Sequence, residues 1–248
     1  MKYLTKEEIM ASEAVKDRLA NFSGPAVKFG FSIEVFDRYK KKYFPGRDVK
    51  VLDCGVASGG FIKNLNDAGY HDLFGVDIDN YLSPDAAKLL KEFKVSDLSF
   101  NKIDWPDNFF DILTGWCLVP HLENPHNFIR EAYRVTRRDG LLIISMINII
   151  SRPNRRYFLK HGDFPGYHVR NNNISLLTPA IFQKTILRYL DLVGTEYFIH
   201  PRVFTGIKGA IRRIIYGIAG KFRPFRTWLS ARWGPKIIYV LKKKEVVG

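Results

Sequence analysis

An acid at position 53 and the small residues behind it are the first candidates for chemistry in this sequence. The stretch reads Asp-Cys-Gly-Val-Ala-Ser-Gly-Gly and follows an apolar segment, so a buried strand is expected to turn directly into a helix. Small side chains in such a turn let the backbone approach a ligand, and the helix start offers unpaired N–H groups. The candidate binding residues of this loop are Asp53, Cys54, Gly55, Ser58 and Gly59.

A second acid follows the next apolar segment, where the chain reads Gly-Val-Asp-Ile-Asp over residues 75–79. An acid at the tip of a second strand can accept hydrogen bonds from both hydroxyls of a ribose. The glycine-containing loop alone is weak evidence, but the loop and the acid together predict a nucleoside-binding site. Asp77 and Ile78 are therefore added to the candidate binding residues.

The loop also indicates what the nucleoside carries. The negative charge of Asp53, directly before the first glycine, would repel phosphates but suits an ammonium group. The Gly-x-Gly-x-x-Gly spacing typical of pyrophosphate binding is broken by Ala57. A ligand with a free amino group and no pyrophosphate is expected.

These motifs resemble those of class I S-adenosylmethionine-dependent methyltransferases. Ser96-Asp97-Leu98 looks like the third motif of that family, in which an acid receives the adenine amino group and the next residue packs on the ring. Residues 105–113, 121–125 and 130–145 are similar to the segments around its fourth and fifth strands, in the branch of quinone-biosynthesis and cell-surface glycan methyltransferases. The resemblance implies S-adenosylmethionine as cofactor, bound in part by Asp97 and Leu98. It also implies a Rossmann-like, doubly wound α/β fold with seven strands, mostly parallel with an antiparallel last strand, and helices on both faces.

Two histidines are candidates for the transfer step. A sulfonium methyl group is already activated, so transfer mainly requires that the acceptor be held close and aligned. A hydroxyl acceptor also needs a base, and histidine is suited to that role near neutral pH. His121 and His168 are the candidates; the alternatives are that His121 caps a turn and that His168 lies on the surface. Trp116 is expected either to line the cofactor or to fill the core.

Two departures from the family narrow the chemistry. The quinone branch carries two glutamates that can hold a divalent cation, and Cys117 and Pro120 stand in their places, so no metal site is predicted. Residues 114–117 lack the Asp/Asn-Pro-Pro-aromatic motif of enzymes that methylate base amino groups. Nucleic acid is therefore not expected as the acceptor.

Composition and hydrophobic patterns place these motifs in one α/β domain spanning residues 1–248, of which 46% are hydrophobic. The two distant cysteines, the acidic N-terminus and the lack of an apolar run of about 20 residues favour a cytoplasmic protein. Strands are predicted at 49–52, 72–76, 110–114, 141–147, 194–199 and 236–242, and helices at 6–19, 33–43 (the N-terminal helices within 5–45), 60–68, 86–93, 127–135 and 178–192. An insertion at residues 151–176 is expected to cover the acceptor site.

A second insertion, residues 206–233, is basic and helical in pattern. The chain from residue 201 carries twelve lysines and arginines against one acid, and so most of the net charge of +14. Its apolar residues recur at helical spacing on one face: Ile207, Ala210, Ile211, Ile214, Ile215 and Ile218. A helix lying in an anionic membrane surface is one interpretation. Packing of this face on the sheet or over the acceptor pocket is another, and RNA binding is a third that no base-specific feature supports.

Two hypotheses of function follow. The first is an O-methyltransferase acting on a small molecule or a lipid-linked saccharide, in the cytoplasm or at the inner surface of the membrane. The second is a non-catalytic adaptor that keeps the fold and binds membrane or RNA through the basic segment. The acceptor and the oligomeric state stay open.

Overall fold

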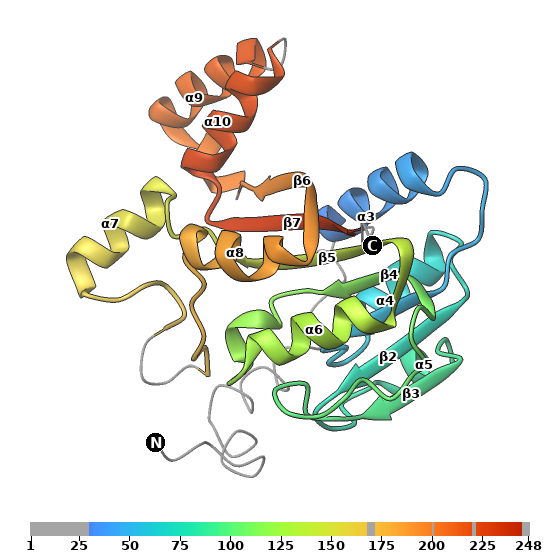
Figure 1. Ribbon diagram of the computed structural model, residues 1–248. Helices are drawn as coiled ribbons and strands as arrows, with labels where there is room; N and C mark the ends of the chain where they lie inside the picture. The colour runs from blue at the N-terminus through green and yellow to red at the C-terminus, as the bar shows by residue number, and fades with distance from the viewer. Residues whose placement is uncertain (1–29, 168–171, 200, 220–221, 245–248) are drawn as a thin grey trace.

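A seven-stranded sheet forms the centre of the molecule (Figure 1). The computed structural model describes residues 30–167, 172–199, 201–219 and 222–244, so the predicted helix at 6–19 lies outside the described residues. The strand order is β3-β2-β1-β4-β5-β7-β6, and β7 pairs antiparallel with both neighbours while the other strands run parallel. The strands are β1 (Val51–Cys54), β2 (Leu73–Asp77), β3 (Glu92–Val95), β4 (Phe110–Gly115), β5 (Thr136–Ile147), β6 (Leu190–Phe198) and β7 (Lys236–Lys243). The predicted antiparallel last strand is confirmed.

Helices cover both faces of this sheet, each through its own buried cluster. On one face, α6 (Pro125–Val135) and α8 (Pro179–Thr185) pack through residues such as Phe128 and Phe182. On the other face, α3 (Gly30–Tyr43) and α4 (Gly60–Asp67) pack through residues such as Phe36 and Phe61. Because the central strands β1, β2 and β4 are buried on both sides, their apolar runs in the sequence are continuous rather than alternating.

The edge strand β3 lies where the sequence predicts part of a helix at 86–93, and that prediction is wrong. Helix α5 (Pro84–Ala87) begins at the Ser83 cap and lasts one turn. Lys91 N then donates to Leu73 O at 2.8 Å, which brings the chain alongside β2. Residues 92–95 alternate polar and apolar, and this period of two suits an edge strand.

The predicted helix at 178–192 also ends early. Thr178 caps α8 as expected, but α8 gives way to a 3-10 turn, η3 (Ile186–Arg188), and β6 starts at Leu190 rather than at 194. Pairing of β6 with β7 over its whole length outweighs the helical pattern of residues 186–192. The insertion at 151–176 holds a helix of its own, α7 (Arg152–His161), which starts at the Ser151 cap and ends at Gly162.

The basic segment is helical, as predicted, and forms a hairpin of α9 (Gly206–Ala219) and α10 (Arg223–Trp233) between β6 and β7. Figure 1 shows this hairpin projecting away from the sheet. The isoleucines of α9 are exposed, from 38% at Ile215 to 86% at Ile207. The interpretation in which this face packs on the sheet or over the acceptor pocket is therefore wrong.

Candidate functional site

The loop between β1 and α4 has the shape that its small residues predict. Gly55, Ala57 and Gly59 all have positive φ angles, of 75°, 51° and 83°. A Cβ atom added to Gly59 would lie 2.2 Å from the Cβ of Ala86, so only glycine fits there. The loop therefore presents bare backbone in front of the start of α4, as binding of a ligand by backbone N–H groups requires.

Asp77 ends β2 beside this loop and fixes its conformation. Its Oδ2 accepts from Ala57 N at 2.7 Å, and its Oδ1 accepts from Ile78 N at 2.7 Å. Each carboxylate oxygen has a second lone pair, so the predicted contact with ribose hydroxyls is compatible with these bonds. Burial raises the pKa of Asp77 to about 6, against the lowering effect of the two backbone hydrogen bonds.

Asp53 lies deeper in the same loop, at the end of β1, and only 2% of its surface is exposed. Its Oδ1 accepts from Thr114 Oγ1 at 2.6 Å, a residue that faces it across the β1–β4 pair. Burial, and to a lesser extent the charge of Asp77, raises the pKa of Asp53 to about 7, while the hydrogen bond from Thr114 lowers it. A carboxylate held this way gains from a cationic partner more than an exposed one would.

Of the other predicted binding residues, Cys54 and Leu98 are buried in the core, whereas Ser58 and Asp97 are half-buried. Cys54 is fully buried in the core and Leu98 is 4% exposed, so Cys54 offers mainly its backbone to a ligand. Asp97 accepts from Ser99 N at 2.9 Å and so caps its own turn. Ser58 is half-buried, and its carbonyl oxygen accepts from Ser83 N at 3.3 Å, before α5.

Trp116 directly follows β4 and contributes both packing and a polar atom. Its ring meets Phe61 of α4 edge-on, with centroids 5.0 Å apart. Its Nε1–H is buried and has no hydrogen-bond partner among the described residues. A buried donor without a partner is costly, so a ligand that accepts this hydrogen bond would relieve the cost.

His121 lies in η2 (Val119–His121), the turn that follows β4, and contacts the returning segment of the 151–176 insertion. Its Nδ1 is 3.1 Å from Asn172 O. A carbonyl oxygen can only accept, so Nδ1 carries the proton and Nε2 is the basic nitrogen of the neutral ring. Pro120 O accepts from Ile174 N and Ser175 N, which ties the insertion to the same turn. His168 lies outside the described residues.

Sequence reasoning missed a polar group on the other side of β4. Cys117 has a positive φ of 56°, and its N–H donates to Ser145 Oγ at 2.8 Å. Lys236 Nζ is 3.6 Å from Cys117 Sγ. Tyr167 lies near the same cysteine, and burial, together with Cys117, raises the pKa of Tyr167 to about 12. Lys236 reaches this group because β7 is antiparallel and begins at the edge where the parallel strands end. That reversal was the signal that could have found Lys236.

No three His, Cys, Asp or Glu side chains gather at a spacing that could hold a metal ion within the described chain. Cys117 faces Ser145 and Lys236, and Pro120 O faces the insertion. That the chemistry needs no metal stays a prediction.

Part of the chain matches a known protein family, and named proteins are similar to it in sequence. Residues 52–144 match the family model of a methyltransferase domain. A Mycobacterium tuberculosis (strain H37Rv) protein named "Probable S-adenosylmethionine-dependent methyltransferase Rv3030" is 26% identical over 159 residues, 63% of this chain and 54% of that protein. The Schizosaccharomyces pombe protein named "Uncharacterized methyltransferase C1B3.06c" is 28% identical over 133 residues, 48% of this chain and 46% of that protein. This chain thus spans about half the length of these relatives.

Solved structures share the fold at lower identity. A SAM dependent methyltransferase from Archaeoglobus fulgidus matches with a TM-score of 0.55 and 19% identity, covering 90% of this chain and 96% of that one. The [4+2]-cyclase SpnF matches with a TM-score of 0.54 and 16% identity, covering 85% and 80%. A likeness at these identities shows the fold alone, and the cyclase illustrates that one fold can carry more than one activity.

The domain matched at residues 52–144, the relatives and the fold together support a class I S-adenosylmethionine-dependent methyltransferase, as the motifs predict. They indicate S-adenosylmethionine as its cofactor. The residues fit that group. The bare loop at Gly59 and the half-buried Asp77 suit a ribose, the buried Asp53 suits a free amino group, and the Trp116 N–H suits an acceptor oxygen of the ligand.

Proposed function

We propose that the protein transfers a methyl group from S-adenosylmethionine to a hydroxyl of a small molecule or a lipid-linked saccharide, with His121 as the base. The observation that carries the proposal is the position of η2 beside the cofactor loop. Leu118, the residue before η2, contacts Gly55 so closely that a Cβ there would lie 3.2 Å from its Cδ1. The same short turn thus connects the cofactor loop with the basic nitrogen of His121.

The residues of the chain have separate tasks in this reaction. The bound cofactor supplies an activated methyl group, so the protein must position the acceptor and remove its proton. His121 Nε2 accepts that proton while Asn172 O holds the ring through Nδ1. The polar group formed by Cys117, Ser145 and Lys236 lies at the same edge of the sheet and provides hydrogen bonds that orient the acceptor.

Cofactor binding is tested by isothermal titration with S-adenosylmethionine. Asp77→Ala removes the acceptor of the Ala57 and Ile78 N–H groups and of the predicted ribose contact, and we expect affinity to fall at least about tenfold. Asp85→Ala removes a nearby acid whose side chain is 80% exposed, and affinity should not change. An Asp77→Ala protein that binds like the wild type would contradict the proposed site.

Methyl transfer is tested with a labelled methyl group and extracts of small molecules and lipids. His121→Gln keeps an N–H donor for Asn172 O but lacks a basic nitrogen. We expect the transfer rate to fall by roughly 10²- to 10⁴-fold with the cofactor Kd unchanged. His126→Gln, in α6, is the matched control and should transfer at the wild-type rate. Cofactor binding by the wild type without transfer to any extract would favour the adaptor hypothesis instead.

A further inference from the structure

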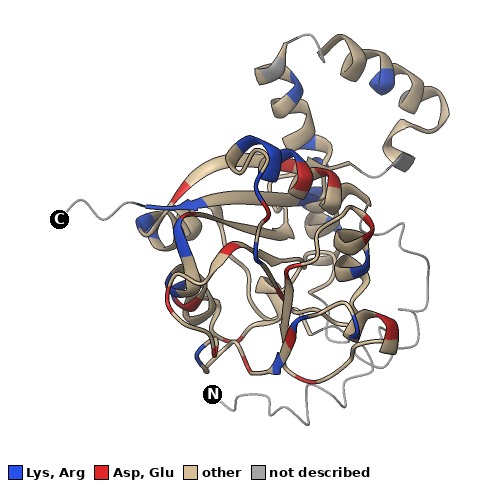
Figure 2. Ribbon diagram, turned by 90° about the vertical axis from the view of Figure 1, so that its right-hand side faces the viewer, with Lys and Arg blue, Asp and Glu red and all other residues tan. Residues whose placement is uncertain are grey.

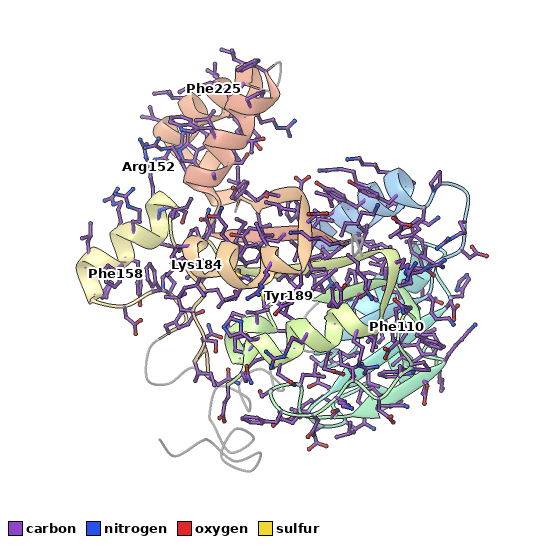
Figure 3. The ribbon with its side chains drawn as sticks, in the orientation of Figure 1. Phe110, Arg152, Phe158, Lys184, Tyr189 and Phe225 are labelled. Carbon is purple, nitrogen blue, oxygen red and sulfur yellow. The ribbon has the colours of Figure 1, made fainter. Side chains whose placement is uncertain are left out.

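The outward surface of the α9–α10 hairpin is apolar over both helices. We define this hairpin surface by its exposed residues, all between 38% and 86% exposed: Ile207, Ile211, Ile214, Ile215, Ile218, Phe222, Phe225 and Trp228. Single exposed apolar residues are ordinary, but five exposed isoleucines along one face of a helix mark an interaction site. Figure 3 shows Phe225 at the far end of the hairpin, away from the sheet.

Packing inside the hairpin fixes which side of α9 faces outward. Gly209 lies against η4 (Pro201–Phe204), where a Cβ would come within 2.3 Å of the Phe204 backbone. Tyr216, two turns later on the same side, pairs its hydroxyl with Ser230 Oγ at 2.9 Å and meets the ring of Trp233. At 100° per residue the isoleucines lie opposite Gly209 and Tyr216. The stripe therefore cannot turn inward without breaking the hairpin.

The charges around this surface have one sign. Residues 206–233 contain seven lysines and arginines and no acid, and Figure 2 accordingly shows blue but no red on the hairpin. Arg212 and Arg213 donate to the carbonyl oxygens of Val203 and Phe204, on the side of α9 where Gly209 packs. Arg232 lies over the ring of Trp228, 4.3 Å from its centroid. A hairpin with an exposed apolar stripe, seven cations and no acid is complementary to a layer with negative headgroups and an apolar interior.

Helix α7, which contacts α10, extends this surface. Four cations, Arg152, Arg155, Arg156 and Lys160, are exposed on α7 next to Leu159, which is 82% exposed, and Phe158, which is 43% exposed. Figure 3 shows Arg152 at the end of α7 nearest the hairpin and Phe158 farther along the same helix. Both insertions leave the sheet at one edge, because Ile147 and Phe198 end β5 and β6 opposite the start of β7. That edge also carries Cys117 and Lys236 of the candidate site.

We propose that the hairpin surface and α7 dock the protein on an anionic membrane surface, with the isoleucines and aromatic residues inserted among the lipid headgroups. Among the described residues no helix is both long and apolar enough to cross a bilayer. The docked protein presents the acceptor side of its sheet to the lipid layer, which selects a lipid-linked acceptor over a freely diffusing one. This last step rests on the proposed function, whereas docking itself does not.

Vesicle flotation of the full chain tests the proposal, with vesicles of phosphatidylcholine alone and vesicles that also contain phosphatidylglycerol. We expect binding to the anionic vesicles, weakened by salt, and little binding to the neutral ones. The double substitution Ile214→Gln with Ile218→Gln should lower the partition coefficient at least about tenfold. It removes two isoleucine side chains that the docked protein would bury in the lipid layer. Arg232→Gln, which removes the cation over Trp228, should lower the partition coefficient about fivefold.

The matched control is Ile181→Gln with Leu192→Gln, which replaces residues of α8 and β6 that are 41% and 44% exposed and lie outside the hairpin surface. Equal flotation of the wild type with both vesicle types, or equal losses in the control and the hairpin variant, would overturn the proposal. So would a wild-type dimer in solution that the hairpin variant converts to a monomer, since the surface would then bind a second copy. Titration with S-adenosylmethionine on the same preparations separates the two proposals. Membrane docking can fail while cofactor binding persists, and cofactor binding can fail while membrane docking persists.

Discussion

Replacement of Asp53 by asparagine should make the protein more stable and a poorer binder of its cofactor. The carboxyl group is 2% exposed, and its pKa of about 7 means that at neutral pH the folded protein carries a buried charge, or is about to acquire one. Asparagine has almost the same shape and can still accept the hydrogen bond of Thr114 Oγ1. The substitution therefore removes the charge and little else.

The size and sign of the effect follow from proton linkage. Raising a carboxyl pKa from 3.8 to about 7 on folding corresponds to a cost on the order of 4 kcal/mol for the ionised form. Between pH 4 and pH 7 the folded state binds more protons than the unfolded state, so Asp53 makes wild-type stability fall as pH rises, and the full penalty is present above pH 7. The asparagine variant lacks this penalty. Because its amide must also find an acceptor, we expect a net gain of about 1–3 kcal/mol at pH 8 and almost none at pH 4.

Cofactor affinity should change in the opposite direction. Loss of a charged partner for the ammonium group should weaken binding at pH 8 by roughly ten- to hundredfold. In the wild type, binding should weaken as pH falls below 7, because Asp53 must then lose a proton to form the ion pair, and the variant should lose that dependence.

Denaturant unfolding without cofactor at pH 4, 6 and 8, and titration with S-adenosylmethionine at pH 6 and 8, measure both effects. Asp85→Asn, a change of the same charge at an exposed site, is the control and should leave both quantities almost unchanged. The reasoning is refuted if the Asp53→Asn protein is no more stable than the wild type at pH 8, or if it binds the cofactor equally well there.

Two further predictions concern the loop and its support. Gly59→Ala should destabilise the protein by about 2–4 kcal/mol and abolish cofactor binding, because it combines φ strain with a clash at Ala86. Gly69→Ala shares the positive φ but has open space around it. It should therefore cost about 1 kcal/mol and leave the affinity for S-adenosylmethionine unchanged. Arg134→Met should lower the free energy of unfolding by about 2–3 kcal/mol, measured with denaturant, because the guanidinium binds two backbone carbonyls and two acids. Arg130→Met, at an exposed site on the same helix, should change the free energy of unfolding by no more than about 0.5 kcal/mol.

The cofactor half could be predicted from the sequence because its signals are local. Gly59 announces a positive φ, Asp77 ends an apolar run, and Asn124 with Pro125 begins α6, so each element is encoded within a few residues of itself. The α3 and α4 helices and the strands near them follow for the same reason. Errors of up to three residues at their ends do not move any side chain to the other face of the sheet.

The parts that failed depend on partners distant in sequence. Residues 92–95 become a strand because β2 offers an edge, and residues 190–193 become one because β7 pairs with them. The stripe on α9 has the same sequence pattern whether it faces a core or a lipid layer. Only the contact between Gly209 and Phe204, and the pair of Tyr216 with Ser230, decide that it faces outward.

The proposed acceptor side of the molecule could not be predicted from local sequence patterns, and the reason is structural. Its edge collects residues from chain segments that no periodicity connects: His121 from the end of β4, Ser145 from β5 and Lys236 from the start of β7. The two insertions, 151–176 and 206–233, enter and leave at this edge, and the sheet needs neither of them to form its core. In the proposed function, changes in the insertions therefore alter the acceptor and the docking surface, while the predicted cofactor residues Asp53, Gly59 and Asp77 stay the same. That separation explains why the cofactor is readable from motifs, whereas the acceptor must be sought through the surface that the insertions expose.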